Sequence, residues 1–243
     1  MEPIRIAIWS GPRNISTALM RSWDSRGDAY VTDEPLYSYY LKYTGLEHPA
    51  RNEILATQNP DWRQVVDWLQ GPVPGGYAIW YQKHMAHHLV GDLPLDWIKS
   101  LSNCLLIRDP AEVLLSYLKK NDEVTAAALG FMQQQQLFDT IRTATGVIPP
   151  VIDARDILQA PERILTALCE RLDIEFTSKM LTWEPGLRKT DGVWAPHWYD
   201  AVAKSTGWQK YSPKSEAIPE EFMPIYRECK DYYNYLYSHR ITP

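Results

Sequence analysis

The sequence is poor in cysteine, in basic charge and in long apolar segments, and each shortage excludes a class of protein. Its 243 residues include only three cysteines, Cys104, Cys169 and Cys229, and none belongs to a CxxC pair. Neither a zinc site nor a disulfide framework is therefore predicted. Acidic residues outnumber basic ones by 30 to 25, for a formal net charge of −5. This balance disfavours a general nucleic-acid-binding protein.

No apolar segment approaches the ~20 residues that cross a bilayer, so we predict no membrane partner. A strand-like segment begins at Ile4, and we expect no signal peptide before it. With reduced and buried thiols, these features predict a soluble, cytoplasmic protein. Hydrophobic residues make up 45% of the chain, which is enough for one sizeable core. We therefore expect one domain over residues 1–243, and no pattern predicts its oligomeric state.

What the sequence does contain is an alternation of strand-like and helix-like segments. Apolar segments rich in β-branched residues predict five strands, at 4–9, 28–35, 77–83, 103–109 and 149–156. Amphipathic spacing predicts five helices, at 14–26, 60–71, 109–120, 123–145 and 160–173. This alternation predicts an α/β fold with a P-loop-type parallel β-sheet flanked by helices on both faces. The aromatic-rich segment at about 36–76 is expected to be an irregular insertion, and the segment from Phe176 an irregular C-terminal wrap.

The segment SGPRNIST (10–17) joins the first strand to the first helix, where an open α/β sheet binds its ligands. A helix N-terminus presents unpaired N–H groups that suit a phosphate or a sulfate. Arg13 adds a positive charge, and Ser16 and Thr17 add hydroxyl donors. The Gly-Lys pair of a triphosphatase loop is missing, because Ser16 and Thr17 stand in its place. The alternative is a strand-to-helix turn that is capped for stability alone.

A second anion site is predicted after the fourth strand. Arg108 ends this strand, and Ser116 follows eight residues later on the next helix. Asp109 suits the N-cap of that helix and Pro110 its first position. An arginine and a hydroxyl so placed suit a second phosphate, so the ligand is expected to have two anionic ends.

These motifs resemble those of the PAPS-dependent sulfotransferases, whose donor is 3′-phosphoadenosine 5′-phosphosulfate (PAPS). GPRNIST resembles their 5′-phosphosulfate loop, and RDPAEVLLS resembles their 3′-phosphate signature. YQKHMAHHL is similar to the Lys/His segment that follows their third strand, and residues 152–174 are similar to a later strand, turn and helix. The start of the chain resembles bacterial sulfotransferase-like proteins with a WSGPRxxST loop. The resemblance covers most of the chain.

The resemblance implies that eight residues bind PAPS: Arg13, Asn14, Ser16, Thr17, Arg108, Ser116, Arg188 and Lys189. The four loop residues would hold the 5′-phosphate, with Arg13 in place of the usual lysine beside the leaving-group oxygen. The other four would hold the 3′-phosphate. Ile15 and Thr190 stand where the family usually has glycine.

Sulfuryl transfer should depend on in-line positioning and on a cation at the departing phosphate oxygen. Arg13 and Lys83 are the candidate cations. A hydroxyl acceptor also needs a base, which typically contributes ~10²–10⁴-fold. In KHMAHH, a helix would place His87 on the same face as Lys83, so His87 is the favoured base and His88 the second candidate. Glu34, at the tip of the second strand, is the competing base. No acidic residue nearby completes a histidine metal site, so no metal is predicted.

The leading hypothesis is an enzyme that transfers a sulfuryl group from PAPS to a small-molecule hydroxyl or amine, without a metal. Two alternatives stay open: a P-loop kinase or phosphotransferase that uses Mg·ATP, and a non-catalytic, nucleotide-binding sulfotransferase-like protein. Trp183, Trp194 and Trp198 are candidates for an apolar acceptor pocket. The acceptor itself is not predicted.

Overall fold

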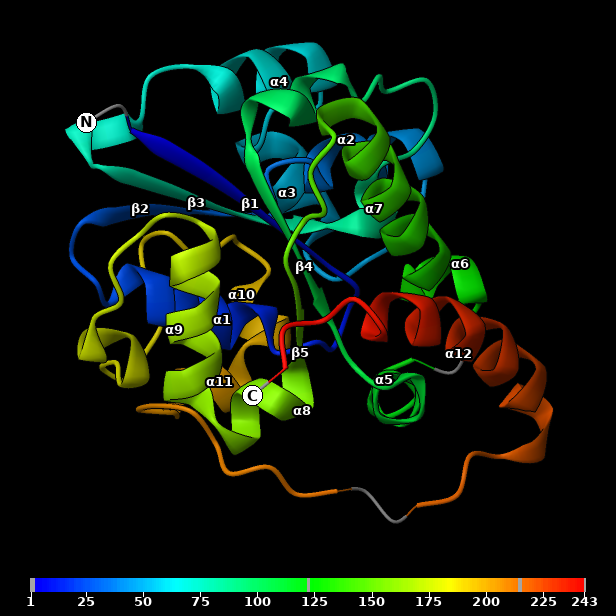
Figure 1. Cartoon of the computed structure of the whole chain (residues 1–243). Helices are drawn as coiled ribbons and strands as arrows, with labels where there is room; N and C mark the ends of the chain where they lie inside the picture. Colours follow the sequence, from blue (N-terminus) through cyan, green and yellow to red (C-terminus); the bar gives the residue numbers. More distant parts are fainter. Residues whose placement is uncertain (1–2, 122, 214–215, 243) are drawn as a thin grey trace.

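Five parallel strands form one sheet in the order β2-β3-β1-β4-β5 (Figure 1). The computed structural model describes residues 3–121, 123–213 and 216–242. The strands are β1 (Ile4–Ser10), β2 (Ala29–Asp33), β3 (Ile79–Met85), β4 (Ser102–Ile107) and β5 (Val151–Asp153). All neighbouring pairs are parallel. The predicted α/β class, with its parallel sheet, is confirmed.

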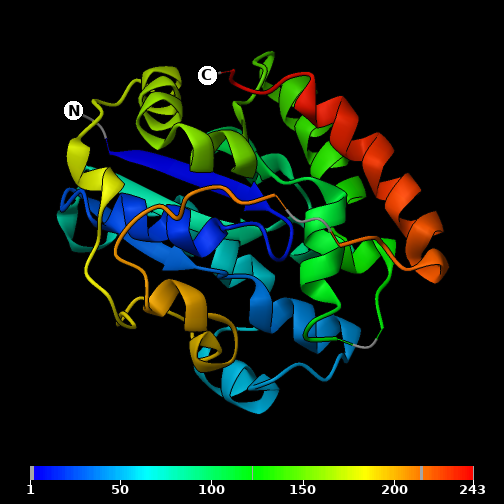
Figure 2. The same ribbon diagram turned by 90° about the horizontal axis from the view of Figure 1, so that it is seen from below.

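Both faces of the sheet are covered by helices, because the side chains of the strands alternate between two buried cores. Along β1, Ile6 and Ile8 belong to one core, which also contains side chains of α1 (Ser16–Asp24) and α9 (Pro161–Arg171). Ala7 and Trp9 belong to the other core. That core contains side chains of α4 (Trp62–Gln70), α5 (Pro110–Tyr117), α7 (Phe131–Thr145) and α12 (Met223–Tyr237). Figures 1 and 2 show α12 lying along α7 on this side.

Two segments that the sequence predicts as irregular contain helices. Besides the predicted α4, the insertion contains α2 (Tyr37–Thr44) and α3 (Arg51–Thr57). The C-terminal segment contains the short helices α10 (Ala195–Trp198) and α11 (Asp200–Ala203), and then α12. The only proline of α12 lies in its first turn, where proline is tolerated. Spacing of three or four residues then buries its Cys229, Tyr233 and Leu236.

The single helix predicted over residues 123–145 is two helices. Gly130, with φ 76°, ends α6 (Ala126–Leu129) and precedes α7. Glycine is favoured in this left-handed conformation, and it commonly ends a helix. Among the described residues, the remaining elements are α8 (Ala154–Gln159) and five 3₁₀ helices: η1 (Pro74–Gly76), η2 (Ala86–His88), η3 (Asp96–Ser100), η4 (Ser178–Leu181) and η5 (Glu220–Phe222).

The register of the central strands brings three loops together at one edge of the sheet. Ser10 of β1 lies opposite Met85 of β3 and Leu106 of β4. The segments that follow these strands therefore leave the sheet at the same level. The chain also changes direction here, because β3 lies on one side of β1 and β4 on the other, and such switch points are where open α/β sheets bind ligands.

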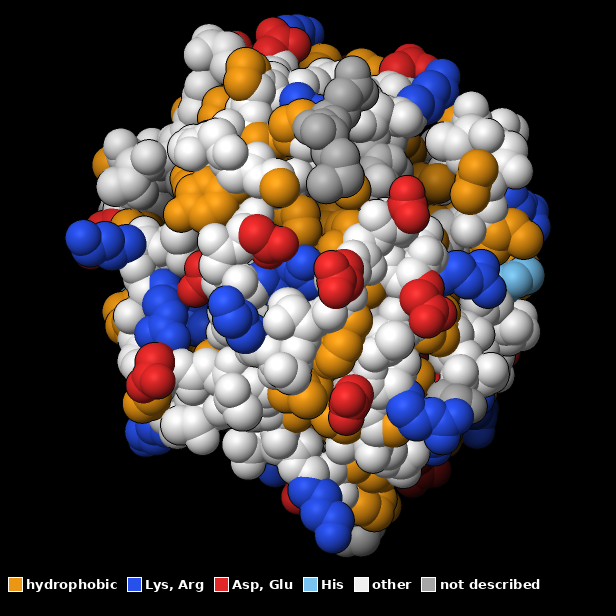
Figure 3. Space-filling view, turned by 60° about the vertical axis from the view of Figure 1, so that its left-hand side comes forward, with side chains coloured by type: hydrophobic (Ala, Val, Ile, Leu, Met, Phe, Trp, Pro, Cys, Tyr) orange, Lys and Arg blue, Asp and Glu red, His pale blue; other side chains and the backbone are white. Residues whose placement is uncertain are grey.

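Three features bear on the predicted environment of the protein. All three cysteines are free and buried, as predicted. No helix within the described residues is long and apolar enough to cross a membrane. On the face seen in Figure 3, Lys and Arg side chains are interspersed with Asp and Glu, with small apolar areas between them. Cytoplasmic location and the absence of nucleic-acid and membrane partners stay predictions.

Candidate active site

The loop between β1 and α1 presents a row of backbone N–H groups. Arg13 and Ile15 have left-handed φ angles of 58° and 46°, and turns of this kind form anion-binding concavities from successive amides. Across the described part of the chain, no protein acceptor pairs with the backbone amides of residues 13–18. Ile15 stands where the resembling family usually has glycine, and its backbone is in the conformation that favours glycine. The loop can therefore receive an anion through its main chain.

Arg13 is a cation without a carboxylate partner among the described residues. Its Nε donates a hydrogen bond to Ser116 Oγ at 3.0 Å. Burial and the positive charge of Arg108 lower the pKa of Arg13. Two adjacent guanidinium groups repel each other unless an anion lies between or beside them, so this pair favours a negatively charged ligand.

Arg108 supports the loop as well as bordering the site. Its Nη1 donates to the carbonyl oxygen of Arg13 at 2.8 Å. Its Nε and Nη2 lie 2.9 and 2.8 Å from Glu112 Oε2. Three of the five N–H donors of the Arg108 guanidinium thus have partners among the described residues. The neighbouring Asp109 caps α5, as predicted, because its side chain accepts a hydrogen bond from the amide of Ala111. The remaining donors of Arg108 can bind a phosphate.

The side chain of Asn14 holds the loop to the sheet. Its Nδ2 donates to the carbonyl oxygen of Leu106 at 2.6 Å, and Gln134 Nε2 donates to the same oxygen at 2.9 Å. One donor of the Asn14 side-chain amide is thus used at the end of β4, and the role of Asn14 at the 5′-phosphate stays a prediction. Its backbone N–H belongs to the row described above. Ser16 and Thr17 border the cavity, as the predicted role requires.

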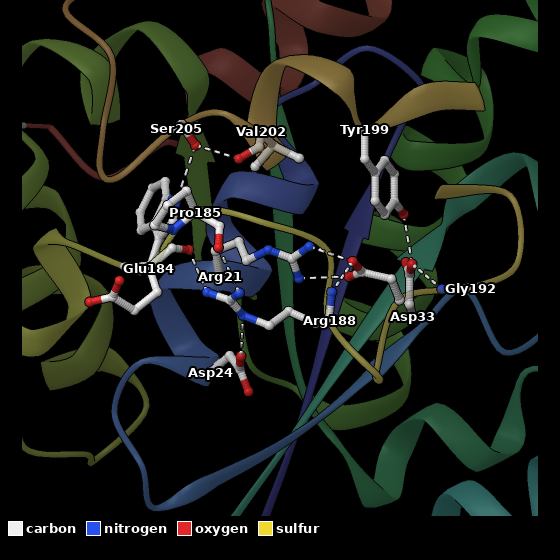
Figure 4. A network of polar contacts seen from close by, with 12 residues as sticks. Arg21, Asp24, Asp33, Glu184, Pro185, Arg188, Gly192, Tyr199, Val202 and Ser205 are labelled. Atoms are coloured by element: carbon white, nitrogen blue, oxygen red, sulfur yellow. Dashed lines mark hydrogen bonds and ion pairs between the residues drawn. The ribbon is translucent and has the colours of Figure 1, made fainter. Parts of the chain in front are cut away.

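Arg188 and Lys189 are not among the residues that line the cavity, so the structure does not bring them beside Arg108, and their role at the 3′-phosphate stays a prediction. Arg188 Nη2 donates to the carbonyl oxygen of Glu184, and its Nε lies 3.6 Å from Asp24 (Figure 4). The cause is a buried ion pair. Arg21 of α1 makes two bonds of 2.6 Å to Asp191, which also accepts from the backbone N–H of Arg188. The ion pair between Arg21 and Asp191 therefore holds residues 188–191 against α1 rather than beside Arg108.

A second group of polar side chains lies at the ends of β2 and β3, and we call it the Lys83 cluster: Asp33, Glu34, Lys83 and Tyr199. Lys83 Nζ lies 2.7 Å from Asp33 Oδ1, 2.5 Å from Glu34 Oε1 and 2.9 Å from the hydroxyl of Tyr199. The Tyr199 hydroxyl donates to Asp33 Oδ2 at 2.7 Å, and the amide of Gly192 donates to the same oxygen (Figure 4).

The cluster keeps Lys83 protonated and occupied. Burial lowers the pKa of Lys83, but the negative charges of Asp33 and Glu34 outweigh burial and raise it well above its usual value. An ammonium group has three N–H donors, and the cluster supplies three acceptors. The structure therefore does not support the prediction that Lys83 stabilises the departing phosphate oxygen, and Arg13 is the remaining candidate.

Glu34 is held in a strained conformation at the edge of the cavity. Its φ of 43° is unusual for a residue other than glycine. Its backbone N–H donates to Lys83 O at 2.9 Å, and its carbonyl accepts from the amide of Tyr37 and from Gln58 Nε2. Burial raises the pKa of Glu34, and the opposing positive charge of Lys83 does not cancel this effect. Strain that the surroundings maintain is often found at functional sites.

The histidines after β3 are buried and neutral. Since β3 continues to Met85, Lys83 and His87 do not share a helical face, and that prediction is wrong. The ring of His88 stacks on those of Tyr37 and Tyr40, with centroid distances of 4.7 and 4.6 Å. Burial lowers the pKa of His87 to about 3 and that of His88 well below its usual value. Neither imidazole has a partner for its Nδ1 among the described residues.

One cavity of about 1040 Å³ joins these features. Its lining includes the loop, Arg108 and Ser116, and also Glu34, Lys83, His87 and His88. Aromatic side chains form much of the remaining wall: Tyr37, Tyr40, Trp183, Trp194, Trp198 and Trp208. The three tryptophans proposed from the sequence thus border it. Among the described residues, no group of three His, Cys, Asp or Glu side chains could hold a metal ion. The cavity can receive an anionic donor and an apolar acceptor together.

Asp33 and Tyr199 are site residues that the sequence analysis missed. Asp33 pairs in register with Lys83 on the neighbouring strand, so a carboxylate beside a strand-end lysine was an available signal. Tyr199 had no such signal, because 116 residues separate it from Lys83.

Gly11 lets the loop pass beneath the end of α6. A Cβ at this position would lie 2.6 Å from the carbonyl oxygen of Leu129, which is too close for any real contact. We expect Gly11→Ala to lower the free energy of unfolding by ~1–3 kcal/mol, because the loop or α6 must move. Urea unfolding monitored by tryptophan fluorescence measures this loss. Unchanged stability would show that the loop does not depend on this close approach.

Fold and site together define an α/β protein whose central loop is built to receive an anionic ligand beside an aromatic cavity. Known proteins identify its family. The sequence profile described as "Sulfotransferase domain" matches residues 4–229, so the chain belongs to the sulfotransferase domain family. The resemblance found in the sequence is thereby confirmed.

Solved sulfotransferase domains share this fold at low sequence identity. The domain from the curacin biosynthetic pathway aligns with a TM-score of 0.55 and 15% identity, and the alignment covers 100% of this chain and 99% of that one. The sulfotransferase from Alicyclobacillus acidocaldarius aligns with a TM-score of 0.55 and 10% identity, over 99% of this chain and 98% of that one.

Two curated proteins of Arabidopsis thaliana are similar in sequence. Branched-chain-amino-acid aminotransferase-like protein 1 is 35% identical over 239 residues, which are 98% of this chain and 42% of that protein. Branched-chain-amino-acid aminotransferase-like protein 2 is 34% identical over 235 residues, 96% of this chain and 41% of that protein. The chain thus spans about two-fifths of the length of these relatives.

Proposed function

We propose that this sulfotransferase-family chain transfers a sulfuryl group from PAPS to a small-molecule hydroxyl or amine acceptor. The observation that carries the proposal is Arg13, a partly buried guanidinium beside Arg108 that no described carboxylate neutralises. The unpaired amides of residues 13–18 adjoin it. These groups fit the two anionic ends of PAPS, and the aromatic wall of the same cavity fits an acceptor.

Different residues of the chain would bind the two ends of PAPS and stabilise the charge that develops during transfer. The loop amides, Ser16 and Thr17 would bind the 5′-phosphosulfate, and Arg108 and Ser116 the 3′-phosphate. PAPS supplies the activated sulfuryl group. Arg13 would stabilise the charge that develops on the departing phosphate oxygen, which is where fixed charges are most effective. Its planar fork does not reproduce the point charge of a lysine, so it also restricts the orientation of that oxygen.

A Mg·ATP-dependent kinase fits these residues less well. The loop has no Gly-Lys pair, and Asp109, which a magnesium site at the end of β4 would use, caps α5 and lies 2.6 Å from Lys230 Nζ. A non-catalytic binding protein predicts nucleotide binding without transfer, and the experiments below distinguish it.

A thermal-shift titration tests the choice of nucleotide. Adenosine 3′,5′-bisphosphate (PAP), the expected product, should stabilise the protein by ~2.7 kcal/mol at about 100 times its dissociation constant, and Mg·ATP should not. Arg108→Ala should remove the stabilisation by PAP. Arg188→Ala is the matched control, because it deletes an arginine outside the cavity and should retain the full effect. Stabilisation by Mg·ATP alone would favour the kinase.

A further inference from the structure

We propose that Tyr211, acting through Glu112, is a positioning residue for the recognition of the 3′-phosphate of the donor. The inference deepens the proposed function and rests on it. Tyr211 belongs to residues 205–213, which we call the strap. In Figure 1 the strap runs along the lower edge of the molecule, from the side of α9 toward α5. Neither Tyr211 nor Glu112 is among the residues that line the cavity, so any effect on a ligand must pass through another side chain.

The first half of the strap is fixed beside the cavity. Trp183 donates from its indole N–H to Ser205 Oγ at 2.9 Å, and from its backbone N–H to the carbonyl oxygen of Thr206 at 3.0 Å. Trp208 Nε1 donates to the carbonyl oxygen of Met180 at 3.1 Å. Ser205 and Trp208 line the cavity, so this half of the strap forms part of its wall.

The other end of the strap contacts α5 through the Tyr211 side chain. Its hydroxyl donates to Glu112 Oε1 at 2.7 Å. The second oxygen of that carboxylate, Oε2, lies 2.9 and 2.8 Å from Arg108 Nε and Nη2. The side chains of Arg108 and Glu112 are only 17% and 12% exposed. Because hydrogen bonds to ionised groups are stronger than those between neutral groups, this chain of contacts fixes the guanidinium.

The orientation of Arg108 decides which of its donors face a ligand. Nη1 donates to the carbonyl oxygen of Arg13, while Glu112 accepts from Nε and from one N–H of Nη2. Within the described residues, this leaves one N–H on Nη1 and one on Nη2. Two N–H groups on one planar fork match two phosphate oxygens, provided that the plane of the fork is held. Glu112 holds this plane, and Tyr211 holds Glu112.

This chain of contacts predicts an effect on one class of nucleotide. PAP presents a 3′-phosphate to Arg108, whereas adenosine 5′-monophosphate (AMP) has none. Through Arg108, Tyr211 can change nucleotide affinity only where a 3′-phosphate is bound. If Tyr211 served only the stability of the strap, its loss would instead change the affinities for PAP and AMP together.

Tyr211→Phe removes the hydroxyl and keeps the ring. We expect it to raise the dissociation constant of PAP by ~3–10-fold, the equivalent of one lost hydrogen bond, and to change that of AMP by less than about twofold. Titration calorimetry of the full chain with each nucleotide measures both constants. Equal changes for the two nucleotides, or an unchanged constant for PAP, would overturn the inference.

Tyr235→Phe is the matched control, because the chain has the same arrangement of side chains away from the cavity. The hydroxyl of Tyr235 donates to Asp139 Oδ1 at 2.7 Å, and Arg142 Nη2 lies 3.1 Å from the same oxygen. None of these three residues is among those that line the cavity. Tyr235→Phe should leave both dissociation constants unchanged. If it weakens PAP as much as Tyr211→Phe does, the effect is not specific to the strap and the positioning role is excluded.

A double-mutant cycle tests whether Tyr211 acts through Arg108. Arg108→Lys keeps a positive charge but has no planar fork to be held, so PAP should still bind, more weakly. Adding Tyr211→Phe to Arg108→Lys should then change the dissociation constant of PAP by less than about twofold. Additive losses in the double variant would show that Tyr211 supports the site by another route.

The transfer reaction gives a second readout. The 3′-phosphate is remote from the sulfur, so its contacts should be equally strong in the ground state and in the transition state, and their loss raises KM without lowering kcat. The probe is sulfur-labelled PAPS mixed with a deproteinised small-molecule extract, and label transferred to extract compounds is measured. Tyr211→Phe should raise the apparent KM for PAPS by ~3–10-fold and change the maximal rate by less than about twofold. A loss confined to the maximal rate contradicts the positioning role.

The outcomes separate this inference from the proposed function. If PAP stabilises the unchanged protein and Arg108→Ala removes that effect, but Tyr211→Phe binds PAP normally, the positioning role is overturned and the proposed function stands. If PAP does not stabilise the unchanged protein, both fail. If PAP binds and the unchanged protein transfers no label, the proposed function fails, and the dissociation constants of PAP and AMP alone decide the role of Tyr211.

Discussion

Lys83→Met lowers the free energy of unfolding by ~3–5 kcal/mol at neutral pH, because it leaves the buried carboxylates of Asp33 and Glu34 without their cation. Lys83 is 1% exposed, so water cannot take its place. Methionine fills a similar volume, and the loss therefore reports charge rather than packing. Urea unfolding at neutral pH measures it.

The loss should shrink as the pH falls. Burial raises the pKa of Glu34, and loss of the positive charge of Lys83 raises it further in the folded chain, so the folded state binds this proton more tightly. Folding is then favoured at low pH, and stability is lost as the pH rises through the folded pKa of Glu34. Lys99→Met is the matched control, since Lys99 makes an exposed ion pair with Asp96. It should cost less than about 0.5 kcal/mol. Equal losses in the two variants would show that the buried cluster is not an ion-paired unit.

Under the proposed function, Arg13→Gln should lower sulfuryl transfer by ~10²–10³-fold, because it removes the cation that we propose stabilises the departing oxygen. It should also weaken stabilisation by PAP. The ligand-free protein should lose little stability, since Arg13 has no described carboxylate partner and lies beside the like charge of Arg108. Label transfer from sulfur-labelled PAPS and thermal shift measure the two effects.

Two further variants sharpen this test. Arg13→Lys restores a charge but not the fork, so it should recover part of the rate. Arg142→Gln removes a half-exposed arginine whose partner is Asp139, and it should leave both readouts unchanged. Transfer by Arg13→Gln within about tenfold of the unchanged protein would exclude Arg13 as the stabilising cation.

The parts of the fold that the sequence predicts well are those with strong local signals. Three elements have signals contained in about a dozen consecutive residues each: the apolar strand at Ile4, the polar turn after it and the capped helix at Asp109. All three are found where the sequence predicts them. The break at Gly130 was available from the sequence, because glycine in a helical pattern often ends a helix. Helix α2 of the insertion was not, because its tyrosines pack by tertiary contact rather than by a clean amphipathic period.

In the candidate site, too, sequence patterns predict what depends on local signals and topology, but not what depends on contacts between distant residues. Arg13, Arg108 and Ser116 follow strand ends or lie on the next helix, so the topology alone brings them together. The position of Arg188 depends on a buried ion pair between Arg21 and Asp191, which are 170 residues apart. No local pattern encodes that pairing, so the motif likeness at Arg188 could not predict where its side chain lies.

The three buried cysteines give the protein a built-in reporter of its own unfolding. Thiol reagents attack the thiolate, and burial raises the pKa of Cys169 to about 11 and of Cys229 to about 12. A thiol-reactive dye should thus stay silent on the native chain without any engineered label. Cys104 of β4 and Cys169 of α9 face the core that α1 and α9 cover, and Cys229 of α12 faces the core on the other side of the sheet, with α7. The order in which the three thiols become reactive therefore records which face of the sheet opens first.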